Sequence, residues 1–432
     1  MYHTPIRHFL LSALFFAVPA TLCAQFEDDD YDDEEEETTD EILMPDGMEA
    51  ELDSLLELWN NKNYLIPEGE CEGGTNPEYD RDTYIHRLQR LPNVIEMPYN
   101  DVVRRFIDQY TGRLRRSVSI ILGASNFYTP IFEEALEAYQ LPLELKYLPV
   151  IESALNPSAV SRAGAVGLWQ FMITTGKQYG LEVTSLIDER RDPIKSSYAA
   201  AHYLKDLYDI FGDWTLVIAS YNCGPNNVRK AIARAGGVKD YWQIYPYLPA
   251  ETRGYVPAFI AANYVMNYYC EHNICPASAQ LPASTDTVTV ERNLHFDQLV
   301  ACCNVKDEEV RALNPQYRTA LIPGDSHSCT LRLPTAAMAT FVQLGDSVYR
   351  YHATDLLTSR REVEVAQAQF TPKPKGRRGR SSRASGGRTA TVRRGDTLGA
   401  IARRNGTTVA QLRKLNRIRG NKIKAGQKIR VK

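Results

Sequence analysis

The chain lacks any long hydrophobic run after its first 25 residues, which excludes a stable membrane anchor in that part of the sequence. Its acidic segment 27–41, EDDDYDDEEEETTDE, has no aliphatic residue and therefore cannot join a core. The basic region after residue 372 has no aromatic side chain on which bases could stack, so nucleic acid is disfavoured as its partner. Hydrophobicity of period two is scarce between residues 95 and 275, which excludes a β-rich fold there.

Residues 1–24 are predicted to be a secretory signal peptide. Arg7 supplies the positive end, FLLSALFFAV the apolar stretch, and LCA a cleavage site of small residues before Gln25. A lipoprotein interpretation through Cys23 is disfavoured, because Leu22 is a poor residue directly before a lipidated cysteine. We therefore expect an exported protein that is peripheral to the cell envelope and has no transmembrane helix in its mature chain.

Seven cysteines remain after removal of this segment, and export favours pairing among them. The nearest plausible pairs are Cys270 with Cys275, and Cys302 or Cys303 with Cys329, while the odd count leaves at least one free thiol. The cysteine spacings do not suit a structural zinc site. No metal and no cofactor is predicted.

The net charge of −3 conceals an acidic start and a basic end. Composition divides the rest of the chain into an acidic disordered leader at 25–80, an all-α domain at 81–280, a small module at 285–336, a linker at 337–388 that ends Pro/Gly/Ser-rich and basic, and a second module at 389–432.

Caps and prolines predict the helices of the α domain. In TPIFEEALEAYQ, Thr129 is the expected N-cap and Pro130 the first helical residue. A later helix should begin after Asp192 and end at Gly212, and DWTLVIASYN should be a short buried helix. Pro257 is expected to bend or break the helix that contains ETRGYV.

The two small modules are related by a constant shift of 102 residues. This shift aligns Val290 with Val392, Leu299 with Ile401, Val310 with Leu412, Leu313 with Leu415, Asn314 with Asn416, and Gly324 with Gly426. We therefore predict a β-α-α-β module used twice, within a fold that is mainly α. Four apolar residues of the second copy are expected to form its core: Leu398, Ile401, Leu412 and Leu415.

Glu152 is the candidate for acid chemistry, because it ends the apolar run YLPVIE. Apolar surroundings keep a glutamic acid protonated near neutral pH, as delivery of a proton to a glycosidic oxygen requires. The alternative is an ordinary helix glutamate paired with Lys146. In GAVGLWQF, small residues could let a sugar approach the backbone beside Gln170.

Four motifs in order, ES, GLWQ, SYN and ETRGYV, resemble the lytic transglycosylases with the soluble-transglycosylase, goose-lysozyme-like fold. The most similar subgroup is the membrane-bound type D with LysM repeats, and the resemblance covers residues 85–275. The segment TVRRGDTLGAIARRNGTTVAQLRKLNRIRGNKIKAGQKIRV resembles a LysM domain along its whole length. A mainly α, lysozyme-like catalytic domain followed by a degenerate and a complete LysM-type module is therefore expected.

The resemblance implies a role for each matched residue. Glu152 corresponds to the catalytic glutamate, and the substrate-binding positions would be Ser161, Gln170, Met172, Tyr221, Asn222, Glu251 and Tyr255. Cys223 departs from the pattern, since a small serine or glycine is commoner after the asparagine. No histidine has a positional relation to it, so a Cys/His nucleophile is rejected.

The implied reaction needs one carboxyl group rather than the two of most glycosidases. Glu152 would protonate the bond between MurNAc and GlcNAc and then deprotonate the MurNAc 6-hydroxyl, which closes a 1,6-anhydro ring. A lysozyme-like muramidase on the same fold, or a non-catalytic wall-binding protein, are the alternatives. The implied partners are peptidoglycan glycan strands, and the implied location is the periplasm or envelope of a Gram-negative bacterium.

The second module is expected to bind N-acetylglucosamine chains through Gly395, Asp396, Thr397 and Asn416. The first copy has Asn293 and Leu294 in place of the Gly-Asp pair, so we expect a degenerate, structural repeat held by a disulfide.

Overall fold

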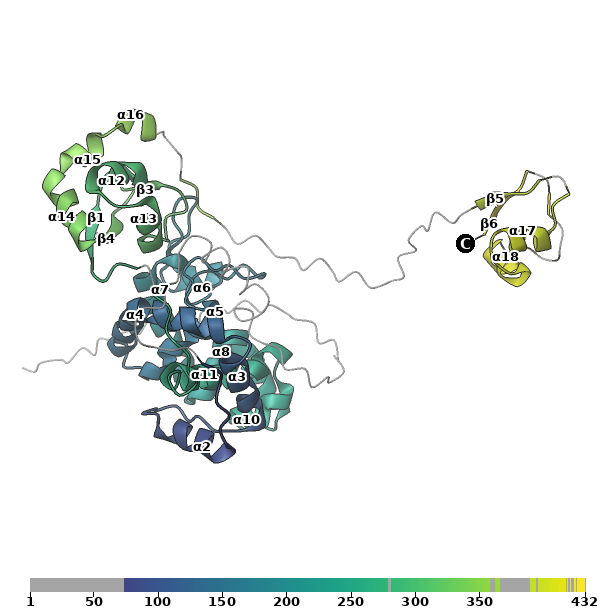
Figure 1. Ribbon diagram of the computed structural model, residues 1–432, viewed down its shortest axis with the longest axis horizontal. Helices are drawn as coiled ribbons and strands as arrows, with labels where there is room; N and C mark the ends of the chain where they lie inside the picture. The colour runs from purple at the N-terminus through teal and green to yellow at the C-terminus, as the bar shows by residue number, and fades with distance from the viewer. Residues whose placement is uncertain are drawn as a thin grey trace, which may run out of the picture. The chain divides into compact units, whose positions relative to one another are not determined.

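A computed structural model describes residues 74–278, 281–357, 362–365, 389–393, 395–416, 418, 420, 423–424 and 426–431. The chain forms two compact units, the first ending at Ala366 and the second beginning at Gln367 (Figure 1). The predicted signal peptide, most of the predicted leader and residues 366–388 of the predicted linker lie outside the described residues.

The first unit begins with a helical domain. Its elements are α2 (Arg81–Arg90), α3 (Asp101–Thr111), α4 (Arg115–Ala138), η2 (Leu143–Tyr147), α5 (Leu148–Ser153), α6 (Ile173–Gln178), η3 (Glu189–Arg191), α7 (Pro193–Phe211), α8 (Trp214–Cys223), α9 (Pro225–Arg234), α10 (Tyr241–Ile244), η4 (Tyr245–Tyr247) and α11 (Ala250–Asn267). Helix α11 is buried from Gly254 to Met266, a stretch in which Asn263 is the one amide side chain, and α3, α5 and α8 pack against it.

The predicted helix of residues 192–212 is confirmed. Asp192 accepts hydrogen bonds from the backbone N–H groups of Ile194 and Lys195 at 2.9 and 3.0 Å, and α7 ends at Gly212 with φ +67°. The short helix predicted for DWTLVIASYN is also confirmed, as α8.

Two proline-based predictions are wrong. Pro130 does not start a helix, because α4 begins at Arg115 and continues through it, with buried side chains on both sides. At Pro257 the expected break is wrong, because α11 continues through this residue, while the alternative of a bend stays a prediction. The ring of Pro257 leaves the carbonyl of Arg253 without a helical donor, and the Tyr241 hydroxyl donates to that carbonyl at 2.9 Å.

The first β-α-α-β copy follows in the same unit. Strand β1 (Thr285–Val290) pairs antiparallel with β4 (Cys329–Pro334), and β2 (Asn293–His295) pairs antiparallel with β3 (Leu321–Pro323). Its helices are α12 (Phe296–Cys303) and α13 (Asp307–Leu313), followed by α14 (Thr335–Leu344), α15 (Asp346–Arg350) and α16 (Ala353–Leu356).

The second unit holds the second copy: β5 (Thr389–Thr391), α17 (Leu398–Arg404), α18 (Val409–Asn416) and β6 (Lys428–Arg430), with the two strands antiparallel. The predicted repeat is confirmed in side-chain detail. Asn314 exchanges two hydrogen bonds with the backbone of Arg332 at 2.7 and 2.8 Å, and Asn416 does the same with Arg430 at 2.8 and 2.7 Å. Each asparagine thereby ties the second helix of its copy to the last strand.

One predicted core residue of the second copy is not in its core. Leu415 is 46% exposed, although Leu398, Ile401 and Leu412 are buried and the matching Leu313 of the first copy is 3% exposed. The small second copy buries one side of α18, which carries Leu412, and Leu415 lies beside that side.

The predicted disulfides are also wrong. Cys275 is disulfide-bonded while Cys270 is free. Asn273, with φ +52°, redirects the chain between the two, and the carbonyl of Cys275 is bound by Ser119 of α4.

No disulfide holds the first copy within its described residues, because Cys302, Cys303 and Cys329 are all free. Cys303 and Cys329 are buried in its hydrophobic core, and this burial raises the pKa of both thiols to about 11. They act there as small apolar side chains.

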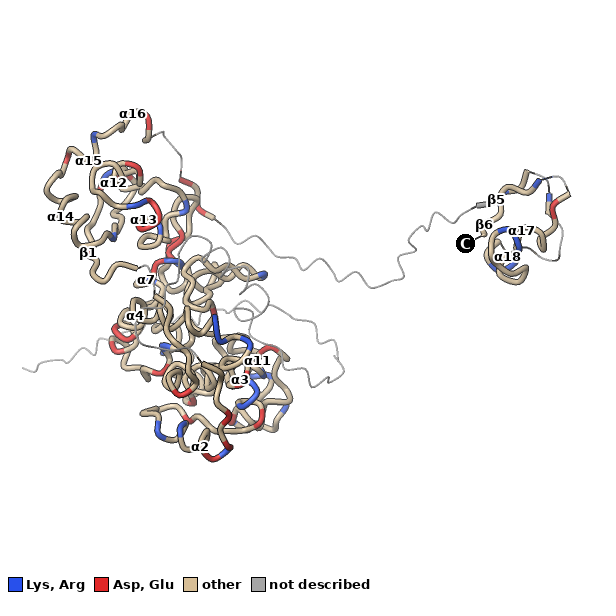
Figure 2. The backbone as a smooth tube through the Cα atoms, viewed as in Figure 1, with Lys and Arg blue, Asp and Glu red and all other residues tan. Residues whose placement is uncertain are grey.

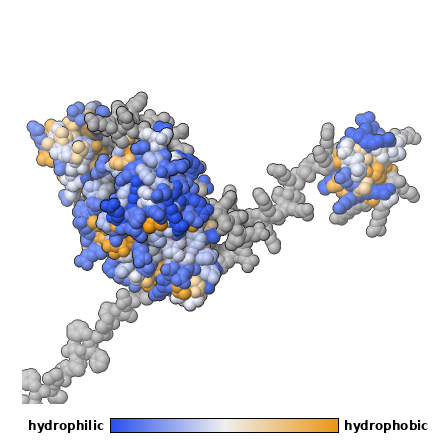
Figure 3. All heavy atoms as spheres, turned by 60° about the horizontal axis from the view of Figure 1, so that its bottom comes forward, coloured by the Kyte–Doolittle hydropathy of each residue, from blue (hydrophilic) through white to orange (hydrophobic). Residues whose placement is uncertain are grey.

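Charged residues of both signs are distributed along the described backbone of both units (Figure 2). On the face in Figure 3, apolar side chains form only scattered patches on the first unit. Among the described helices, none combines the length and the apolarity that a bilayer crossing requires.

Candidate active site

Glu152 lies in the last turn of α5, a helix that is otherwise buried. Leu148, Val150 and Ile151 are at most 2% exposed, whereas Glu152 is half-buried. The helix stops directly afterwards, because Ala154 adopts a left-handed conformation with φ +50°. The single acid of the apolar run is therefore the residue that faces away from the core.

The alternative of a helix glutamate paired with Lys146 is wrong. The Lys146 ammonium forms its ion pair with Glu133, at 2.5 Å between Nζ and Oε1. Glu152 instead receives a hydrogen bond from the hydroxyl of Tyr255 on the buried helix α11.

Two tyrosine hydroxyls flank Glu152. Tyr255 donates to its Oε1, and Tyr221, from α8, donates to the carbonyl of Trp169 at 2.7 Å. Burial raises the pKa of both hydroxyls well above the usual range, and the negative charge of Glu152 raises it further. Both groups therefore remain protonated donors at any physiological pH.

The glycine-rich segment forms a tight loop beside α5. Val166 bridges to Val160 and to Phe171, and the Ser153 hydroxyl donates to the Leu168 carbonyl at 2.9 Å, which ties the loop to the residue after Glu152. The loop is thus fixed to the residue after Glu152 by a hydrogen bond from a side chain to its backbone.

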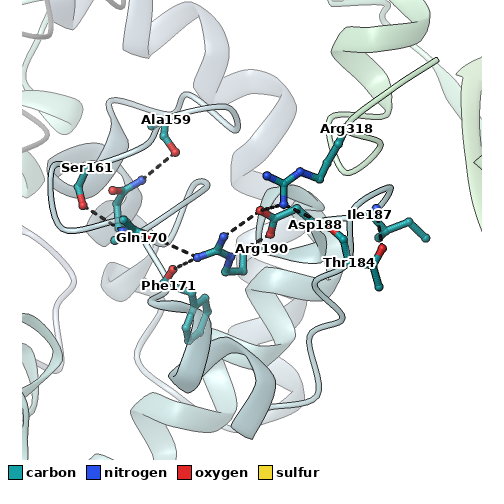
Figure 4. Close-up of polar contacts among 11 residues, drawn as sticks. Ala159, Ser161, Gln170, Phe171, Thr184, Ile187, Asp188, Arg190 and Arg318 are labelled. Carbon is teal, nitrogen blue, oxygen red and sulfur yellow. Dashed lines mark hydrogen bonds and ion pairs between the residues drawn. The ribbon is translucent and has the colours of Figure 1, made fainter. Parts of the chain in front are cut away.

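The side chains of Gln170 and Ser161 form hydrogen bonds within this loop (Figure 4). The Gln170 Nε2 donates to the carbonyls of Gly167 and Ala159 at 2.7 and 3.4 Å, and its backbone has φ +48°. The Ser161 hydroxyl accepts from the Ala165 N–H at 3.0 Å. The interactions that the structure shows for both side chains shape the loop.

Gly167 is required by packing rather than by an approaching sugar. Its φ is +89°, and a Cβ at this position would lie 1.8 Å from the carbonyl oxygen of Arg190. The interpretation of this glycine as a place for substrate to approach the backbone is therefore wrong, since protein backbone already occupies the space.

Arg190 and Asp188 form a buried ion pair that the sequence analysis missed. The guanidinium donates to both Asp188 oxygens at 2.9 Å and to the carbonyls of Phe171 and Gly164 at 3.1 and 3.2 Å (Figure 4). It thereby fixes both ends of the glycine-rich loop. The run DERRD before α7 is the only sequence signal for it.

The SYN and ETRGYV motifs meet between α8 and α11. The Thr252 hydroxyl donates to the Asn222 Oδ1 at 2.7 Å, while Glu251 is exposed, one helical turn before Tyr255. Burial raises the pKa of the neighbouring Cys223 to about 11, so this thiol is protonated at neutral pH.

In the structure, Tyr255 of α11 is thus hydrogen-bonded to Glu152, and Tyr221 lies beside them. Helix α11 also supplies the hydrogen bond that holds Asn222. Met172 lies at the other end of the loop, half-buried, as the residue before α6. The roles of these residues in binding remain predictions.

The residues predicted to bind glycan in the second copy form its turns. Gly395 has φ +90°, and Thr397 caps α17 by accepting from the Ala400 N–H at 3.2 Å. Asp396 accepts from the Arg393 N–H at 2.9 Å and pairs with Arg404 at 2.7 Å. The hydrogen bond from Arg393 is the main cause that lowers the pKa of Asp396.

Comparison with protein families gives three matches along the chain. Residues 129–244 match the transglycosylase SLT domain, residues 284–350 match the LysM-like domain of lytic transglycosylase MltD, and residues 390–432 match the LysM domain. The first match includes Glu152 and the glycine-rich loop, and the other two correspond to the two β-α-α-β copies.

Relatives agree with these matches. The chain is 29% identical over 345 residues to membrane-bound lytic murein transglycosylase D of Escherichia coli K12, covering 78% of this chain and 70% of the relative. It is 32% identical over 124 residues to the soluble lytic murein transglycosylase of the same strain, covering 27% and 19%.

Among solved structures, the crystal structure of the 70 kDa soluble lytic transglycosylase of Escherichia coli matches with 27% identity and a TM-score of 0.30, over 34% of this chain and 25% of that one. From the family matches and the relatives, the chain carries the SLT domain and the LysM repeats of a lytic transglycosylase and is similar to membrane-bound lytic murein transglycosylase D.

Proposed function

We propose that the protein is a peptidoglycan lytic transglycosylase that cleaves the β-1,4 bond between MurNAc and GlcNAc and leaves 1,6-anhydro-MurNAc ends. The observation that carries the proposal is Glu152, a half-buried carboxyl group within the SLT match that receives a hydrogen bond from a buried, protonated tyrosine. A single carboxyl group in this setting can give a proton and then accept one.

The proposed reaction uses one carboxyl group first as a proton donor and then as a proton acceptor. Protonated Glu152 gives its proton to the glycosidic oxygen as the bond to C1 of MurNAc breaks, and the 2-acetamido group stabilises the developing positive charge. The carboxylate then removes the proton from the 6-hydroxyl while O6 bonds to C1. One C–O bond breaks, one forms, no water is consumed, and Glu152 ends protonated as it began.

Tyr255 on α11 and Asn222 on α8 position these groups, and a side chain of α11 holds Asn222. The Tyr255 hydroxyl keeps its proton throughout and holds one carboxylate oxygen, so Glu152 does not rotate between its two tasks. Thr252, three residues earlier on α11, holds Asn222 near the reacting sugar in our proposal. Preorganised donors of this kind lower the barrier because they need no rearrangement during the reaction.

Mass spectrometry of released muropeptides tests the reaction. We expect fragments from purified sacculi to end in 1,6-anhydro-MurNAc, lighter by one water than the fragments that a muramidase control releases from the same sacculi. Reducing ends alone would identify a lysozyme-like hydrolase, and no release at all would indicate a non-catalytic wall-binding protein.

The second unit is proposed to retain the enzyme on glycan strands in the periplasm or envelope of a Gram-negative bacterium. Its LysM match and its Lys and Arg residues, most of which are exposed and whose positions along the backbone are blue in Figure 2, support this role, because positive charge suits anionic wall polymers. The name of the Escherichia coli relative, which is membrane-bound, supports an envelope location.

Deletion of residues 389–432 is therefore expected to weaken binding to sacculi, measured by co-sedimentation, while soluble glycan fragments are still cleaved at the rate of the full chain. Unchanged co-sedimentation would contradict the retention role. The family match at 129–244, which this deletion leaves intact, is the reason to expect unchanged cleavage of the soluble fragments.

A further inference from the structure

A junction joins the helical domain to the first β-α-α-β copy within the first unit. Leu186 and Ile187, from the loop between α6 and α7, are buried in the hydrophobic core of that copy. The backbone N–H of Asp188 donates to the carbonyl of Gln316, and that of Arg318 to the carbonyl of Leu186, both at 2.8 Å. Figure 4 shows Arg318 reaching this loop. The loop is thus shared by the two parts.

A third segment, residues 362–365, completes the junction. Thr184 bridges antiparallel to Glu364, and the Ser185 N–H donates to the carbonyl of Val363 at 2.8 Å. This segment lies after the last helix of the first copy and is the part of the junction nearest in sequence to the second unit. Three stretches that are distant in sequence therefore meet at one place.

One ionisable side chain from each stretch lies at that place: Glu182, His327 and Glu362. One ligand atom of each lies within 4.8 Å of the others. The His327 Nε2 is 3.7 Å from Glu182 Oε2, and its Nδ1 is 4.0 Å from Glu362 Oε2. The side chains of His327, Glu182 and Glu362 are 30%, 41% and 17% exposed, so the cluster lies at the edge of the junction rather than deep inside it.

The cluster contains a buried polar atom without a partner. The Nε2 of His327 is inaccessible to solvent and has no hydrogen-bond partner among the described residues, although it is the atom nearest to Glu182. Such an atom costs free energy unless a ligand satisfies it. It is the kind of donor that a transition metal takes.

The charges of the cluster also call for a cation. The neighbouring basic groups are already paired: Lys177 with Glu364, and Lys195 with Glu189. In the described part of the chain, His327 is the only basic side chain within ion-pair distance of Glu182 or Glu362. Two carboxylates held this close repel each other unless a positive charge lies between them.

We propose that Glu182, His327 and Glu362 bind a divalent transition metal, Zn²⁺ by ligand chemistry, which fastens the helical domain, the first copy and segment 362–365 together. An imidazole and two carboxylates are ordinary zinc ligands, and tetrahedral bonds of roughly 2.1 Å place ligand atoms about 3.4 Å apart. The 3.7 Å between Nε2 and Glu182 Oε2 needs only a small side-chain rotation to reach that spacing.

The surroundings resemble the outer shell of a metal site. The Thr184 hydroxyl donates to Glu362 Oε1 at 2.6 Å, which orients the carboxylate and leaves Oε2 toward His327. A histidine nitrogen among the ligands favours zinc over magnesium or calcium.

The test is zinc content of the purified full chain. After incubation with Zn²⁺ and gel filtration in metal-free buffer, we expect about one zinc per chain by elemental mass spectrometry, and none after Mg²⁺ or Ca²⁺ treatment. His327→Gln and Glu362→Gln should each abolish retention. Glu364→Gln is the matched control, because it removes a carboxylate two residues away that is 80% exposed and pairs with Lys177, and it should retain zinc.

Thermal unfolding gives a second readout that does not depend on metal retention. Zn²⁺ should raise the Tm of the first unit in the parent chain and in Glu364→Gln, and should leave the Tm of His327→Gln unchanged. The absence of bound zinc in the parent chain, or equal zinc in His327→Gln, would overturn the proposal. Neither readout uses glycan cleavage, so the result is independent of the proposed activity.

Discussion

Glu152→Gln is expected to lower muropeptide release by at least about 1,000-fold, because the amide can neither give a proton to the glycosidic oxygen nor take one from the 6-hydroxyl. Glutamine keeps the shape of the side chain and an oxygen that accepts from Tyr255, so α5 should keep its structure. Release is measured by liquid chromatography and mass spectrometry on sacculi, and binding by co-sedimentation, which should be unchanged.

Tyr255→Phe tests the partner of the acid. Loss of a hydrogen bond to a charged group costs about 1.5–3 kcal/mol, so we expect a fall in rate of about 10- to 100-fold. Tyr268→Phe is the matched control at the end of the same helix, since it also loses one hydrogen bond, to the carbonyl of Arg87, but far from Glu152 along α11. If Glu152→Gln kept a tenth of the activity, or if both tyrosine variants behaved alike, Glu152 would not be the acid that we propose.

The motifs were sufficient to predict the fold and to select Glu152. Three of the signals are local: the apolar residues around α5 and α11, the cap at Asp192, and the repeated pattern of the small modules. Local signals are sufficient to predict an element whose structure is determined by its own segment of the sequence. The repeat was visible because its asparagine and core positions keep one spacing.

Contacts between distant segments could not be predicted in this way. The Tyr241 hydroxyl that satisfies the carbonyl freed by Pro257 comes from another helix, so the proline rule alone gave the wrong helix. Glu182, His327 and Glu362 come from three stretches with no common motif, and a spacing rule for metal ligands cannot find them. Tertiary partners decided each of these cases.

Gly167 is another residue whose role depends on a distant segment, here the backbone of Arg190. Gly167→Ala is expected to destabilise the first unit by at least about 3 kcal/mol, from positive φ and from overlap with that carbonyl together. The added Cβ would lie 1.8 Å from the oxygen, so the loop and η3 must move apart. This displacement should break the contacts of the Arg190 guanidinium with Phe171 and Gly164, and muropeptide release should fall with stability.

Gly164→Ala separates the cost of steric overlap of the added Cβ from the cost of a positive φ. Gly164 has nearly the same φ, +90°, but nothing lies within 4 Å of a Cβ there, so only the conformational cost of about 1–2 kcal/mol applies. Thermal unfolding of the two variants should therefore show a clearly lower Tm for Gly167→Ala. Equal shifts would mean that the carbonyl of Arg190 moves away freely, and the glycine-rich loop would then be held by Arg190 and Asp188 without any contribution from the close backbone approach at Gly167.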